Sequence, residues 1–237
     1  AAAGCPDAAA AVDKKDYLAK KSIWIFGGDG WAYDIGFGGL DHVLASGENV
    51  NVMVFDTEMY SNTGGQASKA SNIGEVCQFA AAGKDVSKKS LADIAMSYGY
   101  VYVAQIALGA NMAHAVKVIA EAEAYNGPSL IIGYAPCELH GVKGGMNHCQ
   151  DEMKKAVAAG YWNLFTFNPA LKAEGKNPFT LASKPGDGTY QEFLNNETRY
   201  SRLARSFPDR AEKLFKESEE AAKARYTHLE RLVELYK

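Results

Sequence analysis

The sequence lacks a marked excess of charge of either sign. Its 237 residues include 25 Lys and Arg against 28 Asp and Glu, which gives a formal net charge of −3 at pH 7. Proteins that bind the phosphate backbone of nucleic acid need clustered basic surface. We therefore expect no nucleic acid among the partners of this chain.

Long apolar runs are also missing. The most hydrophobic stretch, residues 129–135, is far shorter than the roughly 20 residues that a transmembrane helix requires. The alanine-rich N-terminus has no basic segment and includes Asp7, which argues against a secretory signal. We expect a cytoplasmic protein that does not enter the membrane. Because the chain starts at Ala1 without Met, we expect it to be an internal piece of a longer protein.

Paired cysteine motifs are absent too. Four cysteines occur, and none forms a CxxC pair or a regular framework: Cys5, Cys77, Cys137 and Cys149. In a chain of this size without an export signal, this favours reduced thiols. His140 and His148 lie near Cys149, but their spacing fits no common zinc site. We expect Cys5 and Cys77 to be chemically inert.

The sequence does contain an alternation of strand-like and helix-like segments. Short β-prone apolar runs alternate with segments of helical apolar spacing: strands at 22–26, 51–55, 100–105 and 129–133, helices at 35–44, 91–98 and 111–125. Such alternation predicts parallel strands joined by crossover helices. The expected fold class is α/β, with a doubly wound, mostly parallel sheet and an irregular and helical C-terminal extension.

Composition divides the chain into three expected regions. Residues 1–20 are rich in Ala and Lys and indicate a linker, and residues 21–167 hold the α/β pattern. Residues 168–237 form a C-terminal arm, irregular at first because of its Pro and Gly dipeptides. The arm ends in a charged helix that begins at Pro208. The spacing of Ser206 and Asp209 predicts a capping box at the start of this helix.

A glycine-rich turn follows the first expected strand. The run from Gly27 to Ala32 reads GGDGWA and precedes a helical segment, where backbone N–H groups can bind an anion. Asp29 would repel a phosphate unless a cation lies between them. Magnesium takes oxygens from one or two protein groups together with phosphates. The turn therefore predicts a site for magnesium and a phosphate group.

A second source of oxygen ligands follows the next strand, in the run Asp56-Thr-Glu-Met-Tyr60. A GDG turn followed at this distance by an oxygen ligand resembles the thiamine-diphosphate-binding motif. Carried over, Asp29 and Thr57 supply side-chain oxygens to magnesium and Met59 supplies its backbone carbonyl. The common pattern has Asn where Thr57 stands.

The Thr at this position sharpens the resemblance. Residues 28–66 closely resemble the family of pyruvate:ferredoxin oxidoreductases, in which a Thr takes the metal position. The resemblance continues through residues 79–84, 96–104, 134–141 and 175–179 and covers roughly residues 20–225. It is far more specific than the GDG alone.

The resemblance implies roles for individual residues. It places Asn62 near the reacting oxoacid as a catalytic residue, and it makes Cys137 one ligand of the [4Fe-4S] cluster nearest the thiamine. The other three cluster cysteines, the glutamate that activates the aminopyrimidine and the arginine that holds the substrate carboxylate have no counterpart in this chain. The implied cofactor-binding residues are Gly28, Asp29, Gly30, Trp31, Ala32, Thr57, Glu58, Met59, Tyr60, Ser61 and Asn62.

The resemblance also implies an activity. Such enzymes carry out the coenzyme A-dependent oxidative decarboxylation of pyruvate to acetyl-CoA and CO2, and electrons pass through [4Fe-4S] clusters to ferredoxin or flavodoxin. This chain would bind the diphosphate and magnesium of thiamine diphosphate. It would be incomplete without the remainder of the oxidoreductase, and the complete enzyme would be a homodimer.

Other interpretations of the sequence stay open. The chain could belong to an enzyme for another 2-oxoacid, such as 2-oxoglutarate, 2-oxoisovalerate or an arylpyruvate, although the long arm favours pyruvate. A Rossmann-type nucleotide module would need GxGxxG, and the turn reads GGDGWA. A purely structural role would make Thr57 a strand end, Asn62 part of an ordinary turn and Cys137 a buried thiol.

Overall fold

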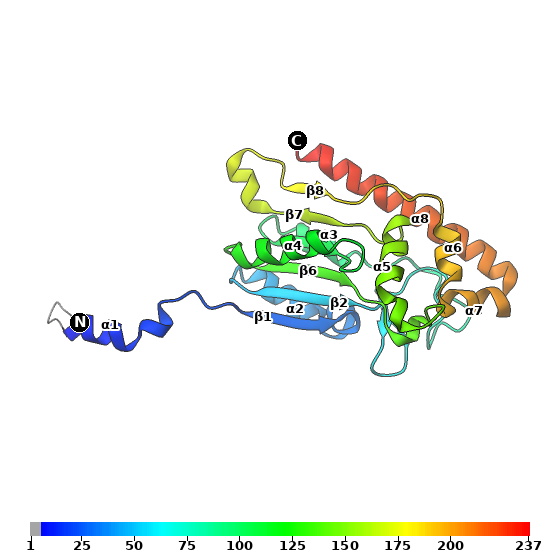
Figure 1. Cartoon of the computed structure of the whole chain (residues 1–237), viewed down its shortest axis with the longest axis horizontal. Coiled ribbons are helices and arrows are strands. Elements are labelled where there is room, and N and C mark those ends of the chain that lie inside the picture. The colour runs from blue at the N-terminus through cyan, green and yellow to red at the C-terminus, as the bar shows by residue number, and fades with distance from the viewer. Residues whose placement is uncertain (1–5) are drawn as a thin grey trace.

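The structure is a computed structural model that describes residues 6–237. Its centre is a sheet of six strands in the order β1-β2-β6-β5-β7-β8 (Figure 1). The first four are mutually parallel, whereas β7 and β8 continue the sheet antiparallel. The strands are β1 Trp24–Gly28, β2 Asn51–Asp56, β5 Tyr102–Ile106, β6 Ser129–Tyr134, β7 Phe165–Phe167 and β8 Phe179–Leu181. The expected α/β class with a mostly parallel sheet is confirmed.

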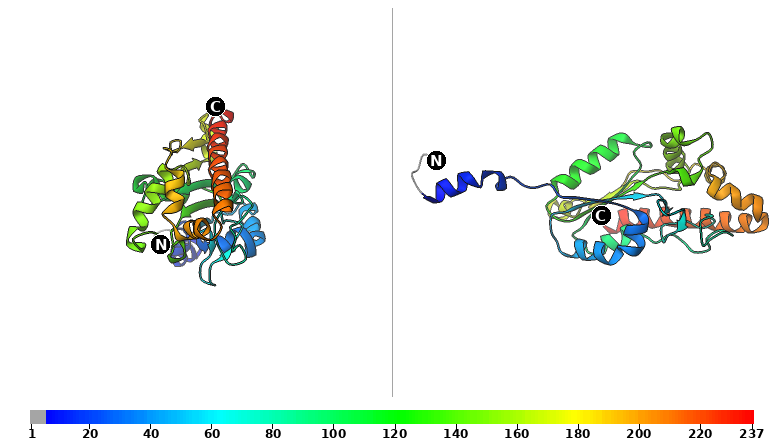
Figure 2. Two further views of the ribbon diagram at one scale, coloured as in Figure 1. Left: turned by 90° about the vertical axis from the view of Figure 1, so that its right-hand side faces the viewer. Right: turned by 90° about the horizontal axis from the view of Figure 1, so that it is seen from below.

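Helices cover both faces of this sheet, as Figure 2 shows in its view from below. Helices α2, Phe37–Ala45, and α3, Leu91–Met96, lie on the face that α8, Pro208–Leu235, also covers, and α4, Met112–Ala124, lies on the other. The remaining α-helices are α1 Pro6–Asp13, α5 Cys149–Ala158, α6 Tyr190–Asn195 and α7 Thr198–Ser206. Short helical turns and a small second sheet complete the chain: η1 Lys15–Tyr17, η2 Gly30–Ile35, η3 Glu138–His140, η4 Met146–His148, η5 Pro169–Glu174, β3 Met59–Tyr60 and β4 Gln66–Ala67.

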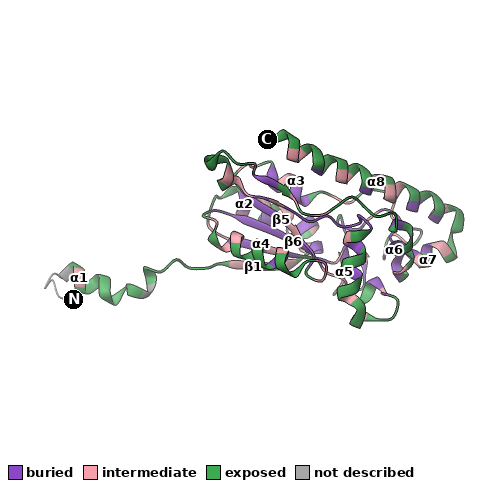
Figure 3. Cartoon of the chain, turned by 45° about the horizontal axis from the view of Figure 1, so that its top comes forward, coloured by how far each residue is buried: buried purple, intermediate pink, exposed green. Residues whose placement is uncertain are grey.

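The central strands β5 and β6 follow from apolar runs that are buried on both sides. In β2, Val52 and Val54 face the larger core under α2, α3 and α8, while Met53 packs against the smaller core under α4. Every residue of β6 is buried, which is typical of a central parallel strand (Figure 3). No helix in the described part of the chain is long and apolar enough to cross a membrane.

The N-terminal lead-in is only partly described. Helix α1 stands apart from the sheet, and the chain then reaches β1 through residues 18–23 (Figure 1). Cys5, expected to be inert, lies outside the described residues.

The C-terminal arm is more regular than expected. Strand β8 pairs with β7, which the sequence did not reveal, and α6 and α7 precede the long helix. The expected capping box is wrong, because Ser206 is the last residue of α7 and Phe207 precedes α8 without a side-chain cap. Pro208 opens α8 instead, where its fixed φ and missing N–H suit the first turn.

Helix α8 packs on the chain's own core through one apolar stripe. Leu214, Phe215, Ala222 and Leu229 are buried on it, and the buried patches alternate with exposed ones along the helix in Figure 3. The helix therefore closes the larger core.

Replacing Leu229 by Ala should lower the free energy of unfolding by about 2–5 kcal/mol, because it leaves a cavity in the core. Leu229 is 3% exposed, whereas Leu235 near the end of the same helix is 72% exposed. Leu235→Ala should change stability by less than about 0.5 kcal/mol. Urea denaturation of both variants checks this, and equal losses would mean that the helix does not dock as described.

Candidate functional site

Three turns of the chain meet at the carboxyl edge of the parallel strands. Strands β1, β2 and β6 run in register, with Gly28 opposite Phe55 and Asp56 opposite Tyr134. The turns that follow these strands carry Asp29, Thr57 and Cys137. These turns lie at the end of the sheet near α5, α6 and α7, on the right of Figure 1. The expected common edge is confirmed.

The turn after β1 depends on close contacts that only glycine allows. A β-carbon on Gly27 or on Gly36 would lie 2.3 or 2.1 Å from the Trp31 ring, and one on Gly30 would lie 2.5 Å from the Tyr60 ring. The turn opens into the π-helix η2 rather than directly into a regular α-helix. Such π-helical turns occur frequently at functional sites.

Oxygen atoms of three residues converge beyond these turns. Thr57 Oγ1 lies 2.7 Å from Asp29 Oδ1 and 3.0 Å from the backbone oxygen of Met59. Ligands at neighbouring corners of an octahedron around Mg²⁺ are about 3 Å apart, because Mg–O bonds are about 2.1 Å long. Both distances from Thr57 Oγ1 to the other two expected ligands therefore fit neighbouring positions around a magnesium ion.

Asp29 is a buried carboxylate held by neutral donors. It is 1% exposed and accepts hydrogen bonds from Ser68 Oγ at 2.7 Å and from Thr57. Burial raises the pKa of Asp29, although these hydrogen bonds partly oppose the shift. No Lys, Arg or His forms an ion pair with it among the described residues. A cation in the cleft would compensate this charge.

A cleft of about 510 Å³ opens in front of these oxygens. Nine of the expected cofactor-binding residues line it: Gly28, Asp29, Gly30, Trp31, Thr57, Met59, Tyr60, Ser61 and Asn62. The apolar part of the lining could not be predicted from the sequence; it is formed by Phe26, Ile35 and Phe55, which are 63%, 83% and 44% exposed. The strand pattern contained Phe26 and Phe55, but nothing in it marked them as exposed. Ser68, which donates a hydrogen bond to Asp29, also has no local signal in the sequence.

Two expected cofactor residues do not reach the cleft with their side chains. Ala32 is fully buried in the larger core. Glu58 is also fully buried, and its side chain points into a network of ionic and polar groups behind the cleft.

The network behind the cleft joins distant parts of the chain. Glu58 lies 3.0 Å from Lys88 Nζ and 2.6 Å from Arg199 Nη2. It also accepts hydrogen bonds from Tyr161 at 2.6 Å and Asn72 at 2.8 Å. Burial would raise the pKa of Glu58, but the two cations lower it to about 2, so this group stays ionised.

The other carboxylates of the network behave differently. Glu75 and Glu197 contact Arg199 at 3.2 and 2.6 Å, and Asp56 contacts Lys88 at 2.9 Å. Burial raises the pKa of both glutamates to about 7 and that of Asp56 to about 6. Two cations thus face four carboxylates, and part of the negative charge is removed by protonation near neutral pH.

Cys137 lies at the end of a hydrogen-bonded chain that starts at Thr57. Its Sγ is 3.5 Å from Ser61 Oγ, which is 2.8 Å from Thr57 Oγ1. His140 Nδ1 accepts the Cys137 backbone N–H at 3.0 Å and lies 3.2 Å from Sγ. The thiol therefore lies on the same edge as Asp29 and Thr57, as its position after β6 predicted.

The other described cysteines show no comparable setting. Cys77 is buried, and burial raises the pKa of its thiol, which keeps it protonated. Among residues 6–237, no group of three or more His, Cys, Asp or Glu side chains could hold a metal ion. A magnesium ion at Asp29 would accordingly depend on phosphate and water for its remaining ligands.

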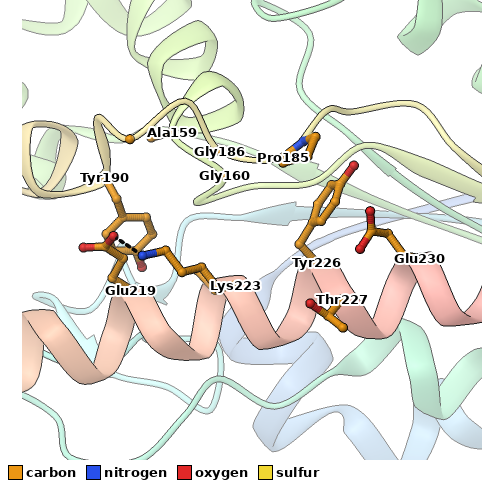
Figure 4. A pocket seen from close by; sticks show the side chains of 12 residues that line it. Ala159, Gly160, Pro185, Gly186, Tyr190, Glu219, Lys223, Tyr226, Thr227 and Glu230 are labelled. Atoms are coloured by element: carbon orange, nitrogen blue, oxygen red, sulfur yellow. Dashed lines mark hydrogen bonds and ion pairs between the residues drawn. The ribbon is translucent and has the colours of Figure 1, made fainter.

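A second hollow of about 380 Å³ lies far along the arm, between α8, the end of α5 and the loop at 185–188 (Figure 4). Three charged side chains line it, and two of them, Glu219 and Lys223, pair with each other at 2.6 Å, while Glu230 is the third. It has no buried, unpaired polar group aimed into it among the described residues. The cleft at Asp29 remains the candidate site.

Comparison with known proteins agrees with this geometry. The family model described as thiamine pyrophosphate enzyme, C-terminal TPP binding domain, matches residues 3–132, more than half of the chain. The chain belongs to this family. The match includes both turns that carry the converging oxygens, Asp29 and Thr57 to Met59.

Relatives of this chain carry pyruvate in their names. It is 59% identical over 221 residues to pyruvate:ferredoxin oxidoreductase of Moorella thermoacetica and 55% identical over 218 residues to pyruvate-flavodoxin oxidoreductase of Klebsiella pneumoniae. These matches cover 93% and 92% of this chain but 19% of each relative. A mitochondrial pyruvate dehydrogenase [NADP(+)] of Euglena gracilis is 54% identical over 93% of this chain and 12% of its own length. The resemblance inferred from the motifs is confirmed, and the chain spans about a fifth of the length of the first two relatives.

One solved structure shows the same fold. The 2-oxoglutarate:ferredoxin oxidoreductase from Magnetococcus marinus, solved with 2-oxoglutarate, coenzyme A and succinyl-CoA, aligns with a TM-score of 0.50 at 19% identity. The alignment covers 83% of this chain and 67% of that one. At this identity the likeness concerns the fold alone.

The ion network predicts a pH dependence of stability. Glu197 holds a proton in the folded protein up to about pH 7, whereas it loses that proton near its ordinary pKa once unfolded. The free energy of unfolding should therefore fall as pH rises between about 4.5 and 7, by on the order of 3 kcal/mol from this group. Glu197→Gln should flatten this fall. Urea titrations across this range check it, with the exposed Glu192→Gln as control, and parallel curves for all three proteins would contradict the assignment.

Proposed function

We propose that this chain anchors the diphosphate and magnesium of thiamine diphosphate within a pyruvate:ferredoxin or pyruvate:flavodoxin oxidoreductase. The observation that carries the proposal is the convergence of Asp29 Oδ1, Thr57 Oγ1 and the Met59 carbonyl oxygen in a cleft at the carboxyl edge of the sheet. Membership in the thiamine-pyrophosphate-binding family supports it.

A cation bound beside Asp29 would supply the positive charge that the lining of the cleft otherwise lacks. Asp29, Thr57 and Met59 would hold Mg²⁺, and the diphosphate would complete its coordination. Gly28 leaves room for phosphate oxygens near the backbone of the turn, because a β-carbon there would meet no atom closer than 4.0 Å. Bound thiamine diphosphate supplies the carbanion-stabilising chemistry that decarboxylation of a 2-oxoacid needs. This chain positions the cofactor for that chemistry.

Asn62 is the residue of this chain that we assign to the reacting substrate. It is exposed and lies in the turn at residues 61–64, which forms one wall of the cleft. Its amide can donate to or accept from a 2-oxoacid. Pyruvate is the proposed substrate, because the relatives named for pyruvate are 54–59% identical to this chain.

Cys137 is proposed as one ligand of a [4Fe-4S] cluster. Its sulfur is linked to the cation site through Ser61 and Thr57, which supports a short path for electrons leaving the cofactor. A cubane cluster normally takes four thiolates, so the other three would come from the remainder of the enzyme. Ferredoxin or flavodoxin would accept the electrons, and coenzyme A would accept the acetyl group.

The assembly is part of the same proposal. Residues 21–167 would form the cofactor-binding domain, residues 168–237 an arm that supports it, and residues 1–20 a linker. The exposed apolar rim at Phe26, Ile35 and Phe55 would be covered by the remainder of the enzyme, which would act as a homodimer in the cytoplasm. The absence of disulfides among the described cysteines supports a reducing compartment.

Asp29→Asn in the complete enzyme should weaken magnesium-dependent binding of thiamine diphosphate at least about tenfold, or 1.4 kcal/mol, because the cation loses its carboxylate. The melting temperature of the cofactor-free form should stay equal or rise, since a buried charge is removed. Thr57→Val should also weaken the magnesium-dependent binding of thiamine diphosphate. Calorimetric titration at several Mg²⁺ concentrations measures this, with Asp41→Asn outside the cleft as control. An unchanged affinity of Asp29→Asn for thiamine diphosphate would contradict the assignment of Asp29 as a magnesium ligand.

Cys137→Ala should alter the electron paramagnetic resonance signal of one reduced cluster in the complete enzyme and slow ferredoxin reduction. Decarboxylation should be affected less, because it precedes electron exit. Cys149→Ala is the matched control and should leave the signal unchanged. This chain alone should bind no stable cluster, since three thiolates are missing. A normal cluster signal in Cys137→Ala would show that Cys137 is an ordinary thiol and not a cluster ligand.

A further inference from the structure

Glu58 has a backbone conformation that is unfavourable for its residue type. Its φ is +64°, in the left-handed region. A residue with a β-carbon keeps such a conformation only where its surroundings hold it. Glu58 stands between Thr57 and Met59, whose oxygens lie 3.0 Å apart because the chain turns here.

Both peptide groups around Glu58 are fixed by buried partners. Its N–H donates to Asp56 Oδ1 at 3.2 Å, and its carbonyl oxygen accepts a hydrogen bond from Ser71 Oγ. Asp56 is held in turn by Tyr33 and Lys88. All of these backbone contacts are shielded from water, which would otherwise compete for them.

The side chain of Glu58 is held even more completely. Four donors reach its carboxylate: Lys88 and Asn72 at Oε1, Arg199 and Tyr161 at Oε2. A fully buried carboxylate with this many charged and neutral donors resists rotation, because any new position would leave ions unpaired. The side chain therefore anchors the turn.

The anchoring donors do not themselves reach the cleft. Lys88, Asn72, Tyr161 and Arg199 are not among the residues that line it. Arg199 belongs to α7 in the C-terminal arm. Besides the direct electrostatic effect of Lys88 on Asp29, the route by which this network can affect the geometry of the cleft is the backbone of Glu58.

We propose that Glu58 is a positioning residue of the cation site, and that Lys88 and Arg199 act through it. The anchored side chain holds the left-handed turn that aims Thr57 Oγ1 and the Met59 carbonyl at one ion. This inference rests on the proposed function and extends it, because it makes the C-terminal arm part of cofactor binding. A residue that only stabilised the fold would leave the affinity of the folded protein for Mg²⁺ unchanged.

The test compares Glu58→Gln with Glu197→Gln in the complete enzyme that carries this chain. Both changes remove one carboxylate beside Arg199, but only Glu58 lies between the two ligands. Thiamine diphosphate binding is titrated with Mg²⁺ by calorimetry, and the melting temperature of each cofactor-free protein is recorded. Glu58→Gln should raise the Mg²⁺ concentration for half-saturation about fivefold or more, and Glu197→Gln less than about twofold.

A milder variant keeps the test decisive if Glu58→Gln does not fold. Tyr161→Phe removes one neutral donor at 2.6 Å from Glu58 Oε2 without changing charge. It should raise the same Mg²⁺ concentration about twofold. An unchanged value in whichever of these variants folds overturns the inference.

Two further outcomes separate this inference from the proposed function. Equal losses in Glu58→Gln and Glu197→Gln would show general loosening of the network and would overturn the positioning role. Asp29→Asn in the same titration tests the cation site itself. If Asp29→Asn loses Mg²⁺ dependence while the Glu58 variants bind normally, the site stands and only the inference fails.

Discussion

The structure depends on one buried guanidinium, that of Arg199. It contacts the carboxylates of Glu58, Glu75 and Glu197, which belong to separate segments of the chain. A buried ion is strongly unfavourable unless all its partners are in place. The loop after β2, the loop at residues 72–77 and the start of α7 must therefore assemble together. This requirement brings the C-terminal arm against the carboxyl edge of the sheet, where it forms the support behind the cleft.

The charge balance behind the cleft explains why a cation suits it. Lys88 and Arg199 face four carboxylates, and burial raises the pKa of Glu75 and Glu197 to about 7, so the excess of negative charge grows as the pH rises through neutral. Asp29 lies beside this cluster, and it accepts hydrogen bonds from the hydroxyl groups of Ser68 and Thr57 and from the backbone amide of Thr57. A bare diphosphate would meet net repulsion here. A divalent cation placed first would reverse the sign of the interaction.

The sequence could predict the parts of this site that depend on local pattern. Apolar runs that end at Gly and Asp located the strand ends, and parallel pairing then brought Asp29, Thr57 and Cys137 to one edge. The ion network could not be predicted, because the pair of Glu58 and Arg199 joins residues 141 positions apart with no local signal. Strand β8 was missed for a related reason, since only its pairing with β7 makes three residues a strand. The misplaced capping box shows the same limit, because Ser206 instead completes α7.

The two parts of the cleft lining differ in kind, and this difference bears on what the chain does by itself. The polar part is assembled within the chain and is held rigid by buried ions. The apolar part, at Phe26, Ile35 and Phe55, is left exposed, although contiguous apolar surface in water usually marks an interaction site. A cofactor anchored by its diphosphate would leave its ring end at this open rim. Because the chain spans about a fifth of the length of its relatives, the arrangement fits a division in which the anchor is built here and the cover comes from the rest of a larger enzyme. A rigid anchor then lets the cover close on a cofactor whose position is already set.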